Sequence, residues 1–268
     1  MALIRVEHVD KSFPSRHGTI SIMQDITFEV KDSDFVAIVG PSGCGKSTLL
    51  RLIQGLDHPT AGSIFFRDQK VDGVCPQMAM VFQSFALYPW LTVAQNVAFG
   101  LEALGWPAER IGSQVDRYIS VTGLDGFQEA YPRELSGGMR QRVGLARALA
   151  VEPAVLLMDE PFSALDPLTA EGLREEVLQL WRDPQLPPEA VLLVSHNIEE
   201  AIQLADRVVV LSRRPGHILA QVAVDLPRPR DRKSAGFYDL TDRVYSLITE
   251  GGTPVPSGAP AEGAPPAG

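Results

Sequence analysis

The sequence predicts an α/β protein built around a parallel β-sheet. From residue 35 onward, short apolar runs alternate with amphipathic runs, and this alternation is typical of parallel strands joined by covering helices. A glycine-rich loop separates the first of these apolar runs, Phe35 to Val39, from a helix expected over about Lys46 to Gln54. Two earlier runs, Leu3 to Val9 and Ile20 to Val30, are bounded by turn residues and predict a small N-terminal β layer.

The later strands and helices follow the same alternation. We expect strands over Val155 to Met158, Val191 to Val194 and Arg207 to Leu211. Helices are expected over Leu168 to Trp181 and Ile198 to Ala205.

A helical segment interrupts this series between about residues 91 and 151. Apolar side chains such as Val93, Val97 and Leu101 recur there at helical spacing. We therefore expect a helical subdomain inserted into a main domain that spans residues 1–225.

The chain changes character after residue 225. Residues 226–250 combine a proline-rich connector with an amphipathic run, Phe237 to Ile248, that predicts a C-terminal helix. Residues 251–268 are nearly all Gly, Pro, Ala and Ser, so we expect a disordered tail. The basic residues of the connector are expected to be solvated, with anionic lipid as the alternative contact. These residues are Arg228, Arg230, Arg232 and Lys233.

The composition excludes several classes of protein. With 45% hydrophobic and 21% charged residues among 268, the chain has an ordinary globular composition. Its apolar runs are far shorter than the roughly 18 residues of a membrane-spanning helix. The start of the chain lacks the basic segment and the long apolar stretch of a secretory signal, so we expect a cytosolic chain. A net charge of −9 disfavours nucleic acid as a partner, and two cysteines are too few for a disulfide framework or a zinc site.

A phosphate-binding loop is expected directly after the apolar run that ends at Val39. Its glycines allow backbone amides to surround phosphate oxygens at a helix N-terminus. We expect Lys46 to reach the β- and γ-phosphates and the Ser47 hydroxyl to ligate Mg²⁺. A catalytic thiol at Cys44 is disfavoured because no histidine is near it in the sequence. The loop matches G-x-x-x-x-G-K-[ST] with Gly40, Pro41, Ser42, Gly43, Cys44, Gly45, Lys46, Ser47 and Thr48.

Two carboxylates, Asp159 and Glu160, follow the apolar run that starts at Val155. In a parallel sheet the carboxyl ends of strands are where ligands bind, and two adjacent acids there are costly unless they are used. We expect Asp159 to hold Mg²⁺ and Glu160 to polarise the attacking water as general base. His196 follows the next expected strand and is placed to face the γ-phosphate.

A second anion site is expected at the start of another helix. Ser136 is a natural N-cap, and Gly137 and Gly138 expose the backbone behind it. A simple P-loop kinase does not need both of these phosphate-binding sites. A head-to-tail dimer, in contrast, can hold the nucleotide between the loop of one subunit and the Ser-Gly-Gly helix of the other.

Together, these motifs resemble those of the nucleotide-binding subunit of ATP-binding-cassette transporters, over residues 3–248. The resemblance implies a P-loop NTPase fold of the ATP-binding-cassette type, with an antiparallel N-terminal β layer, a parallel core sheet and the inserted helical subdomain. The motifs occur in the family's order: Gly40 to Thr48, Gln83, Leu135 to Met139, Asp159-Glu160, Ser163 to Asp166 and His196.

The resemblance also implies roles for single residues. It implies that Gln83 contacts Mg²⁺ or the attacking water and that Asp166 works across the dimer interface. Leu135 and Ser136 begin the signature segment, in which Met139 replaces the commoner Gln without removing the phosphate donors. Phe13 falls where the family places the aromatic residue that stacks on adenine, and an ordinary strand-end aromatic is the alternative.

The segments at 84–97, 198–201 and 204–216 resemble importers of nitrate, sulfonate, taurine and bicarbonate. This branch implies an ATPase that uses ATP and Mg²⁺, dimerises with a second copy or a paralogue, and drives permease subunits from the cytoplasmic face of the membrane. An extracytoplasmic binding protein would supply the solute. An exporter cassette and a non-transport cassette ATPase are the alternatives. Aromatic residues such as Tyr88 and Trp90 are either core or the lining of a groove for a permease helix.

Overall fold

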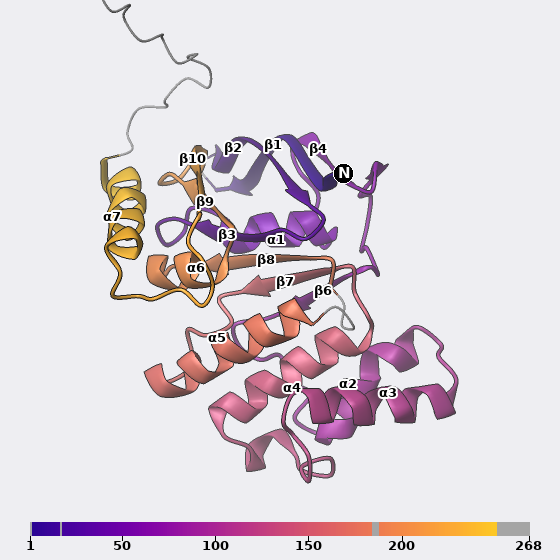
Figure 1. Cartoon of the computed structure of the whole chain (residues 1–268). Coiled ribbons are helices and arrows are strands. Elements are labelled where there is room, and N and C mark those ends of the chain that lie inside the picture. Colours follow the sequence, from indigo (N-terminus) through magenta and orange to yellow (C-terminus); the bar gives the residue numbers. More distant parts are fainter. Residues whose placement is uncertain (1, 17, 184–187, 251–268) are drawn as a thin grey trace, which may run out of the picture.

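The computed structural model describes residues 2–16, 18–183 and 188–250, so the expected tail at 251–268 lies outside the described residues. Two sheets make up the β-structure (Figure 1). The first is antiparallel in the order β2-β1-β4-β5. Its strands are β1 (Ala2–Ser15), β2 (Gly18–Lys31), β4 (Ala61–Phe66) and β5 (Gln69–Lys70).

The second sheet has the order β10-β9-β3-β8-β7-β6. Five of its strands are parallel neighbours, which confirms the expected core sheet. The sequence predicted neither the parallel edge strand β6 nor the antiparallel edge strand β10. The strands are β3 (Phe35–Val39), β6 (Met78–Val81), β7 (Val155–Asp159), β8 (Ala190–Ser195), β9 (Arg207–Leu211) and β10 (Ile218–Ala223).

Two apolar cores lie on the two faces of this second sheet. Alternate residues of β3 point to opposite faces, so that Val36 and Ile38 join one core while Phe35, Ala37 and Val39 join the other. The first core lies between this sheet, α1 (Lys46–Gln54) and the antiparallel sheet. Figure 1 shows α1 between the two sheets.

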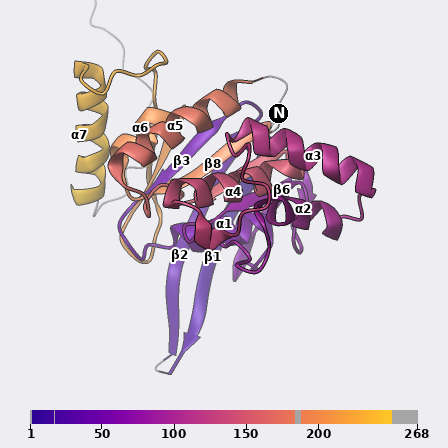
Figure 2. The same cartoon turned by 90° about the horizontal axis from the view of Figure 1, so that it is seen from below.

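Helices cover the second face. They are α2 (Val93–Ala103), α3 (Ala108–Val121), α4 (Gly137–Ala150), α5 (Pro167–Arg182), α6 (Ile198–Leu204) and α7 (Ala235–Glu250), with a 3₁₀ turn at Pro132–Glu134. The segment from α2 to α4 lies on the opposite side of the molecule from α7 (Figures 1 and 2). The second core contains residues of all six helices, so the helical segment and the sheet share one apolar interior.

The first two strands extend further than the sequence predicted. Figure 2 shows β1 and β2 projecting from the rest of the molecule as a hairpin. Beyond Val9 the only buried side chain of β1 is that of Lys11, and pairing with β2 continues to Ser15 opposite Gly18. Backbone pairing rather than apolar burial therefore defines the outer part of the hairpin. For this reason the strand predicted from the apolar pattern ended at Val9, before the observed end of β1.

Candidate functional site

The phosphate loop joins β3 to α1. Lys46 is buried, and its Nζ donates hydrogen bonds to the carbonyl oxygens of Gly40 at 2.9 Å and Pro41 at 3.2 Å. Gly45 precedes α1 with φ of 105°, and a Cβ there would lie 2.8 Å from Cγ2 of Ile22. Both the left-handed backbone and the close approach of β2 require glycine.

A cavity of about 260 Å³ lies over this loop. Its lining joins most of the predicted phosphate-binding residues to one of the two acids. The residues are Ile22, Ser42, Gly43, Gly45, Lys46, Ser47, Thr48 and Glu160. Cys44 is buried instead, and burial raises the pKa of its thiol, which disfavours the reactive thiolate form.

Ser47 and Asp159 form a second part of the site. The Ser47 hydroxyl donates to Oδ1 of Asp159 at 2.7 Å, although the two residues come from α1 and the end of β7. Asp159 is buried, and burial raises the pKa of its carboxyl. A hydroxyl and a carboxylate are the hard oxygen donors that Mg²⁺ prefers, so this pair fits the metal expected from the sequence.

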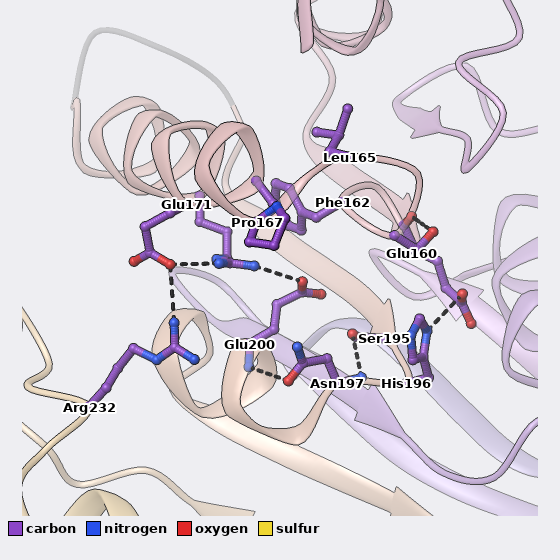
Figure 3. A pocket seen from close by; sticks show the side chains of 13 residues that line it. Glu160, Phe162, Leu165, Pro167, Glu171, Ser195, His196, Asn197, Glu200 and Arg232 are labelled. Atoms are coloured by element: carbon purple, nitrogen blue, oxygen red, sulfur yellow. Dashed lines mark hydrogen bonds and ion pairs between the residues drawn. The ribbon is translucent and has the colours of Figure 1, made fainter. Parts of the chain in front are cut away.

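Glu160 and His196 meet at the same edge of the sheet, as Figure 3 shows. Parallel neighbours β7 and β8 end side by side, and Oε2 of Glu160 lies 3.0 Å from Nδ1 of His196. Glu160 has a φ of 48°, a left-handed conformation that is uncommon for a residue with a side chain. Its N–H donates to the carbonyl of Val194 at 2.9 Å, while Ser163 donates to its carbonyl. The backbone thus fixes the Glu160 side chain facing His196.

The Ser-Gly-Gly segment lies apart from the phosphate loop of its own chain. Ser136 is the N-cap of α4, and its hydroxyl accepts the N–H of Met139 at 3.2 Å. Buried Gly138 packs against α5, since a Cβ there would lie 2.5 Å from Cγ2 of Thr169. Neither Leu135 nor Gly137 lines the cavity over the phosphate loop.

The Gln83 segment is attached to α4. Val81 on β6 pairs with Met158 on β7, and Gln83 and Glu160 each lie two residues after this pair on their own strand segments. Phe85 and Ala86 come next, with φ of 62° and 46°. The guanidinium of Arg147 on α4 donates to the carbonyls of both, at 3.2 and 2.8 Å. Sequence reasoning did not identify this contact.

Asp166 and Phe13 lie on the surface. Asp166 caps α5 by accepting the N–H of Thr169 at 3.1 Å, and the side-chain and backbone hydrogen bonds of Thr169 lower the pKa of Asp166. Phe13 lies in the β1–β2 hairpin, 39% exposed, with Nζ of Lys11 at 4.7 Å from the ring centroid. The exposed ring leaves room for a stacked base.

The basic connector does not behave as expected. Arg230 is not solvated, because its side chain is 1% exposed and donates to the carbonyls of Ile202 at 2.7 Å, Gln203 and Ala205 at the end of α6. Burial lowers its pKa to about 10. Arg228 forms an ion pair with Asp206. The last carbonyls of a helix need donors from outside the helix, and here the connector supplies them.

Known proteins resemble this chain over most of its length. A family profile described as ABC transporter matches residues 23–163. The chain is 42% identical to a nitrate import ATP-binding protein of Synechocystis, over 91% of this chain and 94% of that protein. It is 38% identical to an aliphatic sulfonates import ATP-binding protein of Bacillus cereus, over 93% and 97%.

Solved structures agree with these relatives. The dimeric post-hydrolysis ATP-binding cassette MJ0796, bound to ADP and Pi, superposes with a TM-score of 0.72 at 28% identity. The match covers 82% of this chain and 98% of that chain. CbiO1 of Clostridium perfringens, described as part of an ABC transporter complex, has a TM-score of 0.72 at 26% identity, over 83% of this chain and 89% of that chain.

Proposed function

The chain belongs to the ABC transporter family, and from this premise we propose that it energises a permease for the import of a small anion of the nitrate, sulfonate, taurine or bicarbonate class. ABC transporter ATP-binding proteins are ATPases coupled to transport. The identity to nitrate and sulfonate import proteins over nearly the whole chain supports the direction and the solute class.

One observation carries the chemistry of this proposal. Lys46, the Ser47–Asp159 pair and the Glu160–His196 pair converge at the carboxyl edge of one parallel sheet. In the proposed reaction, water attacks the γ-phosphate in line, Glu160 accepts its proton, and Lys46 and His196 stabilise charge on the phosphate oxygens. The close contact between Glu160 and His196 orients the carboxylate.

Mg²⁺ belongs to this proposal through the residues that would hold it. Ser47, Asp159 and Gln83 are the ligand candidates, the last from the segment after β6. When bound, the ion neutralises charge on the β- and γ-phosphates. The protein contribution is the partly buried pair of the Ser47 hydroxyl and the Asp159 carboxylate, which lie within hydrogen-bond distance of each other.

A second cassette would complete the site. Within one chain, the cavity over the phosphate loop lacks the Ser136 N-terminus of α4. We assign Ser136, with Gly137 and Gly138, to the γ-phosphate of the nucleotide on the facing subunit, and Asp166 to the interface between the two. The dimeric relative bound to ADP and Pi supports this arrangement.

Contact with the permease is assigned to the aromatic segment after Gln83. Trp90 is 69% exposed, so it is not core, and its ring lies 5.7 Å from that of Tyr88. Tyr88 in turn packs on half-exposed Phe99 at 4.4 Å. Exposed aromatic rings in one cluster are typical of the centre of a protein interface. Among the described residues, no helix has the length and apolarity needed to cross a membrane. From the similarity to import ATP-binding proteins we place the chain at the cytoplasmic face, attached to a permease to which an extracytoplasmic solute-binding protein would deliver the solute.

Replacing the proposed base tests the chemistry. Glu160→Gln should bind ATP with unchanged affinity but lose about 10²- to 10⁴-fold in turnover, because a general base contributes that much. The control is Glu175→Gln on the exposed side of α5, which should hydrolyse ATP normally. Normal turnover by Glu160→Gln would move the role of base to His196.

Partner capture tests the transport role. Tagged Glu160→Gln protein, incubated with MgATP and detergent-solubilised native membranes, should recover a multi-span permease identified by mass spectrometry. The same experiment with Trp90→Ala added should lose the permease while the fold is kept. Recovery of soluble partners alone would refute the importer proposal and leave the ATPase assignment in place.

A further inference from the structure

A cluster of five charged side chains lies close to the Glu160–His196 pair. Four of the five, all except Glu199, line one side of a cavity of about 340 Å³ that Glu160 and His196 also line, as Figure 3 shows. The charges come from three segments that are distant in sequence. They are Glu171 and Arg174 on α5, Glu199 and Glu200 on α6, and Arg232 on the connector.

Arg174 is the centre of this cluster. Its side chain is 9% exposed, and its guanidinium donates to Oε2 of Glu171 at 2.6 Å and to Oε2 of Glu200 at 3.4 Å. The guanidinium carbon also lies 5.9 Å from the ring of Phe162, two residues after Glu160. One side chain therefore contacts both segments that carry the catalytic pair.

Stability alone does not account for these buried charges. Replacing a buried ion pair by apolar residues of the same size is often neutral or stabilising. Burial raises the pKa of Glu200, although hydrogen bonds from Ser195 and Arg174 act in the opposite direction. The ε N–H of Arg174 has no hydrogen-bond partner among the described residues. The cluster thus keeps buried charges, which cost free energy of folding, next to the proposed reacting groups.

Glu200 belongs to the turn that carries His196. Asn197 caps α6 by accepting the N–H of Glu200 at 3.2 Å, and the Asn197 N–H donates to the Ser195 hydroxyl at 2.9 Å. Because α6 has only seven residues, a shift of Glu200 moves its whole first turn. The position of His196 therefore depends on what holds Glu200.

We propose that Arg174 is a positioning residue for ATP hydrolysis, which holds the first turn of α6 so that His196 stays in contact with Glu160. This inference rests on the catalytic roles given to Glu160 and His196 above. Arg232 supports the array from the connector, because it donates to the same Glu171 oxygen as Arg174 does, at 3.1 Å. The C-terminal extension is thereby linked to the catalytic edge.

The first test compares kcat with KM. Arg174→Met and Glu200→Gln should each lower kcat by about 10²-fold, the usual effect of a displaced catalytic group, and leave KM for ATP within about twofold. Glu200→Gln keeps the size of the side chain and guards against a folding defect in Arg174→Met. The control is Arg207→Met. Arg207 lies on β9, pairs with Asp34 and does not line the cavity, so this variant should keep the wild-type kcat. Normal kcat in both test variants would overturn the proposal.

The second test is a double-mutant cycle in single-turnover assays with ATP labelled on the γ-phosphate. If Arg174 acts through His196, Arg174→Met should cause no further loss in a His196→Ala background. Losses that multiply would overturn the positioning role while leaving that of His196 intact. A wild-type rate for His196→Ala alone would instead refute the proposed catalytic role of His196.

An NMR measurement gives a readout that does not need turnover. The ring signals of His196, assigned among the five histidines by substitution, should shift in Arg174→Met in the same direction as in Glu160→Gln. Arg207→Met should leave them unchanged. Unmoved His196 signals in folded Arg174→Met would also overturn the proposal.

Discussion

The hydroxyl of Tyr118 provides a sharp test of how the helical segment is packed. Tyr118 lies on α3, is fully buried, and its hydroxyl has no hydrogen-bond partner among the described residues. Burial of a polar group without a partner costs about 1 to 3 kcal/mol. Tyr118→Phe removes this group and leaves only a small void, so we expect the free energy of unfolding to rise by about 1 kcal/mol at neutral pH.

The same residue should make stability depend on alkaline pH. Burial raises the pKa of Tyr118 to about 12, from about 10 in the unfolded chain. Between these values the unfolded state loses a proton that the folded state keeps, so stability falls as pH rises. At about pH 11 the loss from this one group is about 1.4 kcal/mol, and above pH 12 it approaches about 2.7 kcal/mol.

Urea unfolding of wild-type protein and Tyr118→Phe at about pH 7.5 and about pH 11 measures both effects, because the other titrating groups cancel in the difference. The stability advantage of Tyr118→Phe should grow by about 1.4 kcal/mol between the two. Tyr238→Phe, at a 60% exposed position on α7, should show neither effect. An advantage that stays constant with pH would mean that the Tyr118 hydroxyl is solvated or bonded in the folded protein.

Three further substitutions test other parts of the structure. Gly138→Ala should abolish ATPase activity while nucleotide still binds, because its Cβ would lie 2.5 Å from Thr169 and displace the start of α4. Phosphate release measures the ATPase activity, and fluorescence titration measures nucleotide binding. Arg147→Met should speed amide hydrogen exchange around residues 85–86, whose left-handed backbone it holds, and unchanged exchange would show that Arg147 is dispensable there. Arg230→Met should lower the free energy of urea unfolding by about 3 kcal/mol or more, since three helix-end carbonyls lose their donor and each buried polar group without a partner costs about 1 to 3 kcal/mol; a loss below about 1 kcal/mol would contradict this.

The sequence predicted the centre of the fold well. The bounds of β3, α1 and β9 coincide with the expected ranges, because each is a buried apolar run or a motif with a defined start. Local signals also located Asp159 and Glu160, since a buried strand that ends in two acids is rare. The closeness of Glu160 and His196 agrees with the expected order of β7 and β8, because the carboxyl ends of neighbouring parallel strands share an edge. The Ser47–Asp159 contact joins α1 to β7, with β8 between β3 and β7, and was not predicted.

Other features had no local signal. Basic residues in a proline-rich connector look solvated in sequence, and only the folded position of α6 turns Arg230 into a donor for its terminal carbonyls. Arg174 and Glu200 likewise occupy ordinary helical positions, and the partnership between them needs α5 and α6 to pack. Edge strand β10 was missed because its pairing with β9 depends on a turn between them.

The position of β3 in the sheet has a consequence for biosynthesis. Phe35 pairs with Val191 on one side, and Val36 pairs with Arg207 on the other. A ribosome therefore completes the phosphate loop long before either neighbour of its strand exists. Until then both edges of an apolar strand are open to pairing with other chains. Nucleotide binding thus arises late in synthesis, and the growing chain depends on protection of this strand from aggregation.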